Sequence, residues 1–285
     1  MREALVFGAS GQVGRPLLAR LREDGWNVLA VSRQTRPDVP GVRWLQGGFD
    51  ALPEALPRAC DVVFSCGPLD RFARWYADSE IDAAQVIAFG STSVHVKGDS
   101  PDAAERDVAA RLREGETCVA SAAAQRGALA VLLRPTLVYG SGRDRTLSRI
   151  AAIAHRWGRF ALPRDASGLR QPVHVDDLAI AALDACRHRA QGAFDLPGGE
   201  TLAYREMVAR VLAALDPPAR LHELPAPLFG AALALARMRG GVRGFGDAAL
   251  ARMRRDLVFD PAPARAAFGY APRAFRPTAG MFIPD

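Results

Sequence analysis

Three glycines near the N-terminus constrain the fold more than any other feature of the chain. Gly8, Gly11 and Gly14 follow an apolar run at residues 4–7 and precede a helical pattern that begins near Pro16. Glycine permits a tight strand-to-helix turn and lets a pyrophosphate approach the backbone, while the free N–H groups of the helix attract the anion. Because the strand and the helix are both present, the turn is predicted to hold a dinucleotide.

Apolar strand-like runs alternate with amphipathic helical segments through the first half of the chain. Strands are expected at residues 26–31, 42–45, 61–66, 85–89 and 130–138, and helices at residues 51–58, 71–82 and 101–126. This alternation is typical of an α/β protein of the Rossmann type, with a doubly wound parallel sheet covered by helices on both faces.

The second half of the chain changes character, with shorter strands and stretches rich in proline, glycine and arginine. We expect residues 1–142 to form the dinucleotide-binding core and residues 171–200 to return to it. Residues 143–170 and 201–285 are expected to form a smaller substrate lobe. A chain of this length suits such a core with an appended lobe.

The end of the second strand favours NADP over NAD. A carboxylate at this position would bind the ribose 2′-hydroxyl of NAD, whereas an arginine suits the 2′-phosphate of NADP. The chain has no acid here and instead carries Ser32 and Arg33. A solvated loop arginine is the alternative interpretation of Arg33.

Composition narrows the classes of partner. The net charge is +6, and Lys97 is the only lysine among 37 basic residues. The basic balance suits a phosphate-bearing ligand, with a coding bias toward arginine as the alternative. There is no aromatic-studded basic stripe, no C-x-x-C pair and no apolar stretch of about 20 residues. We therefore expect a cytoplasmic protein without nucleic-acid, metal or membrane partners.

Four segments together resemble the extended short-chain dehydrogenases, the NAD-dependent epimerase/dehydratase family. The glycine turn is similar to the fingerprint of that family, and three later segments match its other motifs in order and spacing. They are residues 133–140 (LRPTLVYG), 173–179 (VHVDDLA) and 194–199 (FDLPGG). Members of the family mostly act on nucleotide sugars as epimerases, dehydratases or reductases, so the resemblance implies a small-molecule substrate of that kind.

The resemblance also implies site residues. Ser91 takes the place of the catalytic serine, which polarises the hydroxyl or carbonyl group that undergoes hydride transfer; a strand-end hydroxyl that caps the local backbone is the alternative. The cofactor contacts implied by position are Gly8, Ser10, Gly11, Gln12, Val13 and Gly14 in the turn, with Cys66, Gly67 and Pro135 at the ends of later strands.

The Tyr-x-x-x-Lys pair on which the chemistry of the family normally rests is missing. The expected helix at residues 101–126 contains neither a tyrosine nor a lysine. Alignment on Glu116 puts Val108 and Leu112 at the two positions, and a shift by one residue gives Asp107 and Arg111. An arginine does not lose its proton in a protein, so neither alignment restores the pair.

Other residues are candidates for the missing acid or base. His95 and Lys97 follow Ser91 closely, and both are predicted to serve in catalysis, with an ordinary strand-end histidine and a solvated loop lysine as the alternatives. Arg252 and its basic neighbours could bind a substrate phosphate or could form a solvated helix face.

The sequence therefore predicts an NADP-dependent oxidoreductase or epimerase with a non-standard proton donor. A catalytically silent NADP(H)-binding sensor is the alternative, because the Tyr-x-x-x-Lys pair is absent. The sequence leaves a homodimer open.

Overall fold

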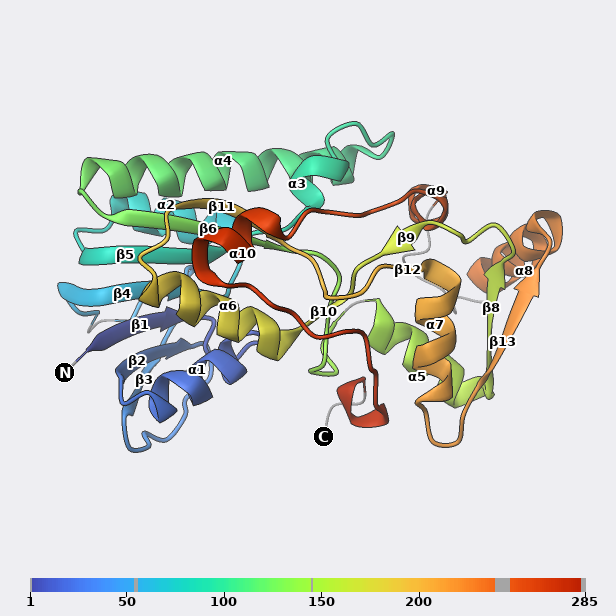
Figure 1. The fold of residues 1–285 in the computed structure, drawn as a ribbon, viewed down its shortest axis with the longest axis horizontal. Helices are drawn as coiled ribbons and strands as arrows, with labels where there is room; N and C mark the ends of the chain where they lie inside the picture. The colour runs from blue at the N-terminus through green and yellow to red at the C-terminus, as the bar shows by residue number, and fades with distance from the viewer. Residues whose placement is uncertain (1, 54–55, 145, 239–246, 283–285) are drawn as a thin grey trace.

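A seven-stranded parallel sheet forms the core of the molecule. The computed structural model describes residues 2–53, 56–144, 146–238 and 247–282. The strand order is β11-β6-β5-β4-β1-β2-β3 (Figure 1), which confirms the predicted Rossmann-type sheet. The strands are β1 (Glu3–Phe7), β2 (Asn27–Ser32), β3 (Val42–Gln46), β4 (Ala59–Ser65), β5 (Asp82–Phe89), β6 (Leu129–Pro135) and β11 (Gly192–Leu196).

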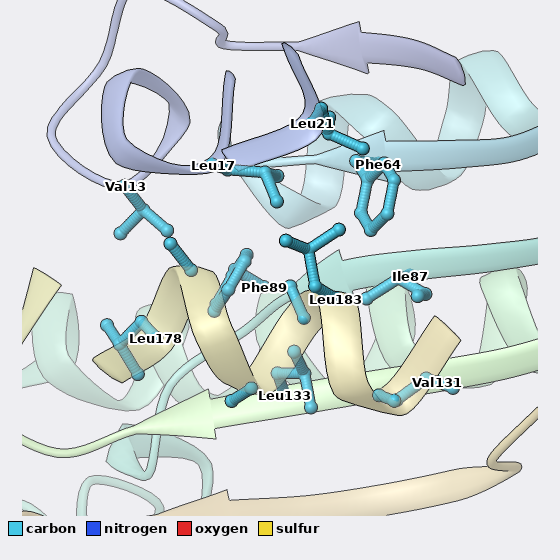
Figure 2. Packing of buried hydrophobic residues seen from close by; sticks show 14 of the residues in the cluster. Val13, Leu17, Leu21, Phe64, Ile87, Phe89, Val131, Leu133, Leu178 and Leu183 are labelled. Carbon is cyan, nitrogen blue, oxygen red and sulfur yellow. The ribbon is translucent and has the colours of Figure 1, made fainter. Parts of the chain in front are cut away.

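Helices cover both faces of this sheet. On one face α1 (Gly14–Glu23) and α6 (Val175–Arg187) insert apolar side chains between themselves and the strands, as Figure 2 shows. On the other face lie α2 (Leu69–Asp78) and α4 (Ala103–Gln125). The labelled residues of Figure 2, such as Leu17, are almost fully buried, and each large apolar side chain contributes about 1.5–3 kcal/mol on burial.

Successive residues of the strands serve the two faces in turn. In β1, Ala4 and Val6 belong to the cluster under α1 and α6, whereas Leu5 and Phe7 belong to the cluster under α2 and α4. Side chains of a strand alternate with a period of two residues, so a strand buried on both faces must be apolar throughout. That requirement explains the continuous apolar runs from which the strands were predicted.

Two predicted elements differ from the structure. The helix expected at residues 51–58 is wrong, because none of its described residues is helical and Ala51 forms an isolated bridge with Gly48. Proline at positions 53 and 57 disfavours a helix there. The single strand expected at residues 130–138 is divided, since β6 ends at Pro135 and β7 (Val138–Tyr139) pairs with β10 (Val173–His174) instead.

A second lobe has its own apolar core. It contains α5 (Leu147–Trp157), α7 (Tyr204–Ala213), α8 (Ala226–Met238) and α9 (Asp247–Arg254). Two small sheets complete it, pairing β8 (Arg159–Pro163) with β13 (Arg220–Leu224) and β9 (Leu169–Arg170) with β12 (Leu202–Ala203). In Figure 1 this lobe lies beside the carboxyl edge of the core sheet.

A C-terminal segment that we expected in the second lobe packs on the core sheet instead. α10 (Ala262–Phe268) packs its Phe268 edge-on against Phe194 of β11, with 5.2 Å between the ring centroids. Shortly after α10, the Tyr270 hydroxyl donates to the Pro197 carbonyl at 2.7 Å. The C-terminal segment thus covers the β11 side of the sheet and then runs back toward the second lobe, where η1 (Ala279–Met281) lies.

Candidate functional site

The glycine turn between β1 and α1 is closely packed against itself and against the end of β4. Gly8 has φ +71°, and a Cβ there would lie 2.9 Å from the carbonyl carbon of Cys66. A Cβ on Gly14 would lie only 2.2 Å from the Gly8 carbonyl oxygen, so any side chain would separate the helix from the strand. Gly11 donates its N–H to the Gly8 oxygen at 2.9 Å. The turn therefore brings bare backbone to the start of α1, where an anion would bind.

Polar atoms at the carboxyl edge of the sheet fit a dinucleotide. Gln12 Oε1, Ser65 Oγ and Ser141 Oγ are buried, and none of the three has a hydrogen-bond partner among the described residues. Buried polar atoms without partners are uncommon in folded proteins, and a bound ligand is one of the standard explanations. The residues present are thus suited to hold NAD(P) at this edge.

The ends of β1 and β2 lie side by side, because the two strands pair in parallel. Ser32 is buried, and its hydroxyl lies 3.4 Å from that of Ser10 and accepts the N–H of Gln34 at 3.2 Å. Arg33 is exposed, and its stem passes Gly48, where a Cβ would lie 3.2 Å from Arg33 Cγ. The two hydroxyls border the glycine turn, while the Arg33 side chain passes the segment that follows β3.

Three other arginines gather at the glycine turn and were not selected from the sequence. Arg143 Nη1 donates to the Ser10 carbonyl at 3.1 Å. Partial burial and the positive charges of Arg143 and Arg36 lower the pKa of Arg15, and the Arg36 guanidinium lies 5.2 Å from the ring centroid of Trp44 in β3. Arg36 Nε is buried without a partner among the described residues. Arg15 directly follows Gly14 and Arg36 lies four residues after Ser32, and those positions were the available signal.

The remaining predicted cofactor contacts lie at the ends of β4 and β6. Cys66 continues β4 by donating its N–H to the Phe7 carbonyl at 2.9 Å, and burial raises the pKa of its thiol to about 12. Gly67 lies against the ring of Phe49. The Pro135 carbonyl accepts hydrogen bonds from the N–H and the hydroxyl of Thr92, both at 3.2 Å. These bonds fix the loop that carries Ser91.

A cavity of about 330 Å³ opens beside this edge, between the core and the second lobe. It is lined by residues from α3 (Ser93–Val96), the β6–β7 connection, α5, β9, α7 and the segment from α9 onward. The lining residues are Ser91, Thr92, Ser93, Val96, Lys97, Thr136, Leu137, Thr146, Arg149, Arg170, Gln171, Tyr204, Arg252, Met253, Leu257 and Phe259.

Ser91 lies on the cavity wall directly after β5. Its Oγ accepts the N–H of Ser93 at 3.1 Å, so the hydroxyl caps the first turn of α3. The hydroxyl proton is not used in that bond and is available to a ligand. The capping role that we considered as an alternative is therefore present together with access to the cavity.

Lys97 lines the same cavity as Ser91. It is half-buried at the end of α3, and its ammonium group has no hydrogen-bond or ion-pair partner among the described residues. Two of the three predicted catalytic side chains therefore share one cavity.

His95 is directed into a charged network instead of the cavity lining. Its Nε2 lies 3.0 Å from Asp195 Oδ1 and 3.4 Å from Arg134 Nη1. Arg134 in turn donates to both oxygens of Glu116, at 2.7 and 2.5 Å. Since a Cβ on Gly90 would lie 3.3 Å from Glu116 Oε1, this network lies directly under the turn that holds Ser91.

The two α4 positions where the family's tyrosine and lysine would project carry the apolar, half-buried side chains of Val108 and Leu112. Val108 and Leu112 border a separate small cavity of about 170 Å³ next to Leu69 at the start of α2. The alternative residue Arg111 pairs with Asp107 and Asp70 on the surface, at 3.0 and 3.4 Å. Among the described residues, α4 contributes none to the lining of the larger cavity. An acid or base must therefore come from another element.

The far end of the larger cavity is formed by the second lobe. Arg170 is 6% exposed and donates to the carbonyls of Leu169 at 2.6 Å, Arg255 at 2.8 Å and Arg252. Its guanidinium lies 5.2 Å from the ring centre of Tyr204.

Arg252 of α9 forms an ion pair with Glu105 of α4, which links the two lobes across the cavity. Arg170 and Tyr204 were not selected from the sequence, because neither belongs to a short pattern that marks a site. For Arg252 the sequence left a phosphate contact and a solvated face open, and the structure places it at the cavity.

The part of the chain that the structure describes was also searched for metal sites and for membrane-spanning helices. No group of three histidine, cysteine, aspartate or glutamate side chains is arranged to hold a metal ion there. No helix there is both long and apolar enough to cross a bilayer.

A family model matches the middle of the chain. Residues 98–196 match the model described as "NAD dependent epimerase/dehydratase family". A 2-alkyl-3-oxoalkanoate reductase from Stenotrophomonas maltophilia (strain K279a) is 30% identical, with 75% of this chain and 76% of that protein covered. A dTDP-4-dehydro-6-deoxy-D-allose reductase from a Streptomyces species is 24% identical over 96% of both chains.

Solved structures show the same fold. MoeE5 in complex with UDP-glucose and NAD superposes with a TM-score of 0.69 at 20% identity, covering 96% of this chain and 94% of that one. The similarity extends through both lobes, so the second lobe is part of the shared architecture.

Proposed function

Because the chain belongs to the NAD dependent epimerase/dehydratase family, we propose that it is an NAD(P)(H)-dependent oxidoreductase that acts on a nucleotide sugar or a related carbonyl compound. The observation that carries this proposal is the position of Ser91. Its hydroxyl lines a cavity at the carboxyl edge of the sheet, the same edge at which the glycine turn presents its backbone. Ligands of open α/β sheets bind at that edge.

The side chains of the cavity support reduction of a carbonyl group with a proton donor other than the usual tyrosine. A bound nicotinamide supplies the hydride. Ser91 donates its free proton in a hydrogen bond to the carbonyl oxygen of the substrate and so polarises it. Lys97 transfers a proton to the same oxygen as negative charge develops there, and solvent reprotonates the resulting amine. His95 acts as a positioning residue, because it holds Asp195 and Arg134 beneath the serine turn.

NADP is the cofactor that the charges at the glycine turn favour. Arg15, Arg36 and Arg143 face this region, and no acidic residue follows β2 as a partner for a 2′-hydroxyl. Charged hydrogen bonds to a phosphate contribute about 1.5–3 kcal/mol each. We extend the assignment from Arg33 to this group, because the charges of Arg143 and Arg36 both act on Arg15, the residue that follows the last glycine of the turn.

A cofactor-binding sensor without turnover is the second candidate, and the apolar face of α4 favours it. The two functions differ in one measurable outcome. A sensor binds NADPH and leaves it unreacted, whereas a reductase oxidises it when the correct carbonyl substrate is present.

The test begins with calorimetric titration of NADPH and NADH, followed by NADPH absorbance with a panel of nucleotide sugars, β-keto acids and keto phosphates. We expect NADPH binding and oxidation with at least one carbonyl compound. Tight binding without oxidation of NADPH by any compound supports the sensor. The absence of binding by either cofactor overturns both candidates.

A further inference from the structure

We propose that the second-lobe end of the cavity is a subsite for one compact anionic group, a carboxylate or a phosphomonoester, carried by a small carbonyl substrate. This inference rests on the proposed function and narrows it, since it selects a small anionic carbonyl compound over a nucleotide-linked sugar. It concerns Arg170, Tyr204 and Arg252, which lie away from the glycine turn.

The charged side chains that line the cavity are all positive. The described residues that line it include Lys97, Arg149, Arg170 and Arg252 but no aspartate or glutamate. Glu105 neutralises part of the charge of Arg252 from outside the lining. A concave site lined by one sign of charge concentrates ligands of the opposite sign.

Arg170 is the clearest sign of a missing anion. It is almost fully buried and bonds only to backbone carbonyls, and no carboxylate forms an ion pair with it among the described residues. Burial is the largest cause that lowers its pKa, and the charge of Arg252 lowers it further, while Tyr204 and the carboxylate of Asp256 oppose these effects in part. Asp256 offsets the cost of this burial only in part and forms no direct ion pair with Arg170, so an anionic ligand group would relieve the remaining penalty.

Tyr204 offers a free hydroxyl beside this guanidinium. Tyr204 belongs to the apolar cluster of the second lobe together with Tyr139, but of the four tyrosines it is the one that lines this cavity. Tyr204 is 5% exposed and lines the cavity, and its hydroxyl makes no hydrogen bond to a described residue. A phenol donor next to two guanidinium groups is suited to bind carboxylate or phosphate oxygens.

Arg252 is held in place before any ligand arrives. Its Nη1 pairs with Glu105, whose other oxygen accepts the Ser100 hydroxyl at 2.8 Å. Arginine has five N–H donors in a planar fork, so this pair leaves donors for a ligand. The arrangement fixes α9 against α4 and limits the loss of side-chain entropy on binding.

The size of the cavity limits what accompanies the anion. About 330 Å³ is near the lower end of ligand pockets, which run from about 300 to 1,000 Å³. Met253, Leu257 and Phe259 add apolar wall next to the cationic end. These properties suit a short, partly apolar carbonyl compound with one anionic end better than a sugar that carries a nucleoside diphosphate.

The test measures binding to the full chain by calorimetry, with and without saturating NADPH. The probes are benzoate, phenyl phosphate, neutral benzyl alcohol and UDP-glucose. We expect one or both small anions to bind more tightly than benzyl alcohol by about tenfold or more, the range of a charged hydrogen bond. Benzoate and phenyl phosphate distinguish a carboxylate from a phosphate subsite.

Variants assign the effect to the subsite. Arg252→Gln should weaken binding of the preferred anion by about tenfold or more, and Tyr204→Phe by a few-fold. Arg205→Gln is the matched control, because Arg205 is exposed one residue along α7 and should bind as the wild type does. Glu105→Gln removes the link between the lobes but keeps the cation, so it should retain anion binding.

Three outcomes overturn the subsite. They are UDP-glucose binding more tightly than both small anions, benzyl alcohol binding as tightly as they do, or Glu105→Gln losing as much affinity as Arg252→Gln. Loss of NADPH binding alone counts against the proposed function, because the measurements without cofactor still test the anion subsite.

Discussion

The glycine turn and the cavity differ in the part of the chain that forms them, backbone in the turn and side chains in the cavity. The turn is made of backbone over seven consecutive residues, and its requirement for small residues is visible wherever a Cβ would strike the chain, as at Gly14. The cavity is made of side chains from both lobes, which approach only after the whole chain has folded, as Ser91 and Arg252 do. A backbone site is therefore fixed by local geometry, whereas a side-chain site can change its chemistry residue by residue while the fold stays the same.

The largest effect should come from replacing glycines of the turn. Gly14→Val should abolish NADPH binding and cost about 3 kcal/mol of stability, because its Cβ would lie 2.2 Å from the Gly8 oxygen. Gly11→Val should abolish binding but leave the fold intact, since a Cβ there meets only the Gly8 oxygen, at 3.0 Å. Urea unfolding and NADPH titration measure both effects.

Gly230→Ala is the control for these glycine variants. A Cβ on Gly230 meets nothing within 4 Å, so unfolding and binding should match the wild type or show slightly higher stability. Normal NADPH binding by Gly11→Val would show that the turn is not the phosphate site. The contrast between a backbone site at the turn and a side-chain site at the cavity would then be wrong.

The next largest effect should be on turnover. Ser91→Ala and Lys97→Met should each lower kcat by about 10²–10³-fold, the range for a lost hydrogen-bond donor or a lost positioned acid. NADPH affinity should stay the same, because neither residue touches the turn. Steady-state kinetics on the identified substrate and cofactor titration separate the two effects.

Lys97→Arg sharpens the test of Lys97. Arginine keeps the charge but does not release a proton, so kcat should remain low if Lys97 is the proton donor. Recovery of most of the activity in Lys97→Arg would instead make Lys97 an electrostatic contact.

A smaller effect is expected for the preference between cofactors. Arg36→Gln should weaken NADPH binding by about tenfold to a hundredfold and leave NADH binding unchanged, because the proposed assignment gives Arg36 a contact with the 2′-phosphate, which NADH lacks. Arg33→Gln should have less effect, since Arg33 is exposed beside Gly48. Titration of both cofactors decides which arginine contributes to NADPH affinity. A larger loss of NADPH affinity in Arg33→Gln than in Arg36→Gln would assign the 2′-phosphate contact to Arg33.

The smallest effect concerns pH and stability. Burial lowers the pKa of His174 below its ordinary value of 6.5, and the charge of Asp176 opposes this only in part. Below about pH 6.5 the unfolded chain binds a proton that the folded imidazole resists, so stability should fall as the pH drops through this range.

His174→Asn should reduce that pH dependence. Asparagine still provides a side-chain oxygen to accept the Asp176 N–H, the bond that His174 Nδ1 makes at 3.2 Å, but it does not titrate. Urea unfolding at pH 5.5 and 7.5 compares the two proteins. An equal loss of stability in both would remove His174 as the cause.

Much of the core was predictable from the sequence, and the reasons are local. Strands buried on both faces require apolar runs, and the glycine turn requires small residues, so both features are visible without a structure. Pro135 was also visible, but whether it interrupts one strand or separates two depends on β10, which lies far along the sequence.

The candidate site was predictable only in part. Ser91 and Lys97 follow one strand, so their closeness in sequence gave their closeness in space. The pairing of His95 with Asp195 depends on β11 lying next to β6, a contact between residues 100 positions apart. The meeting of Arg170, Tyr204 and Arg252 depends on the packing of the second lobe, for which no short pattern exists.

The return of α10 to the core has a consequence for the order in which the protein matures. A nascent chain leaves the ribosome N-terminus first, and its β11 side stays uncovered until α10 and Tyr270 have emerged. The core therefore finishes folding only after the second lobe has been synthesised, although it contains the first residues of the chain. A message truncated just before α10 should yield a product with exposed Phe194, which cellular proteases would remove.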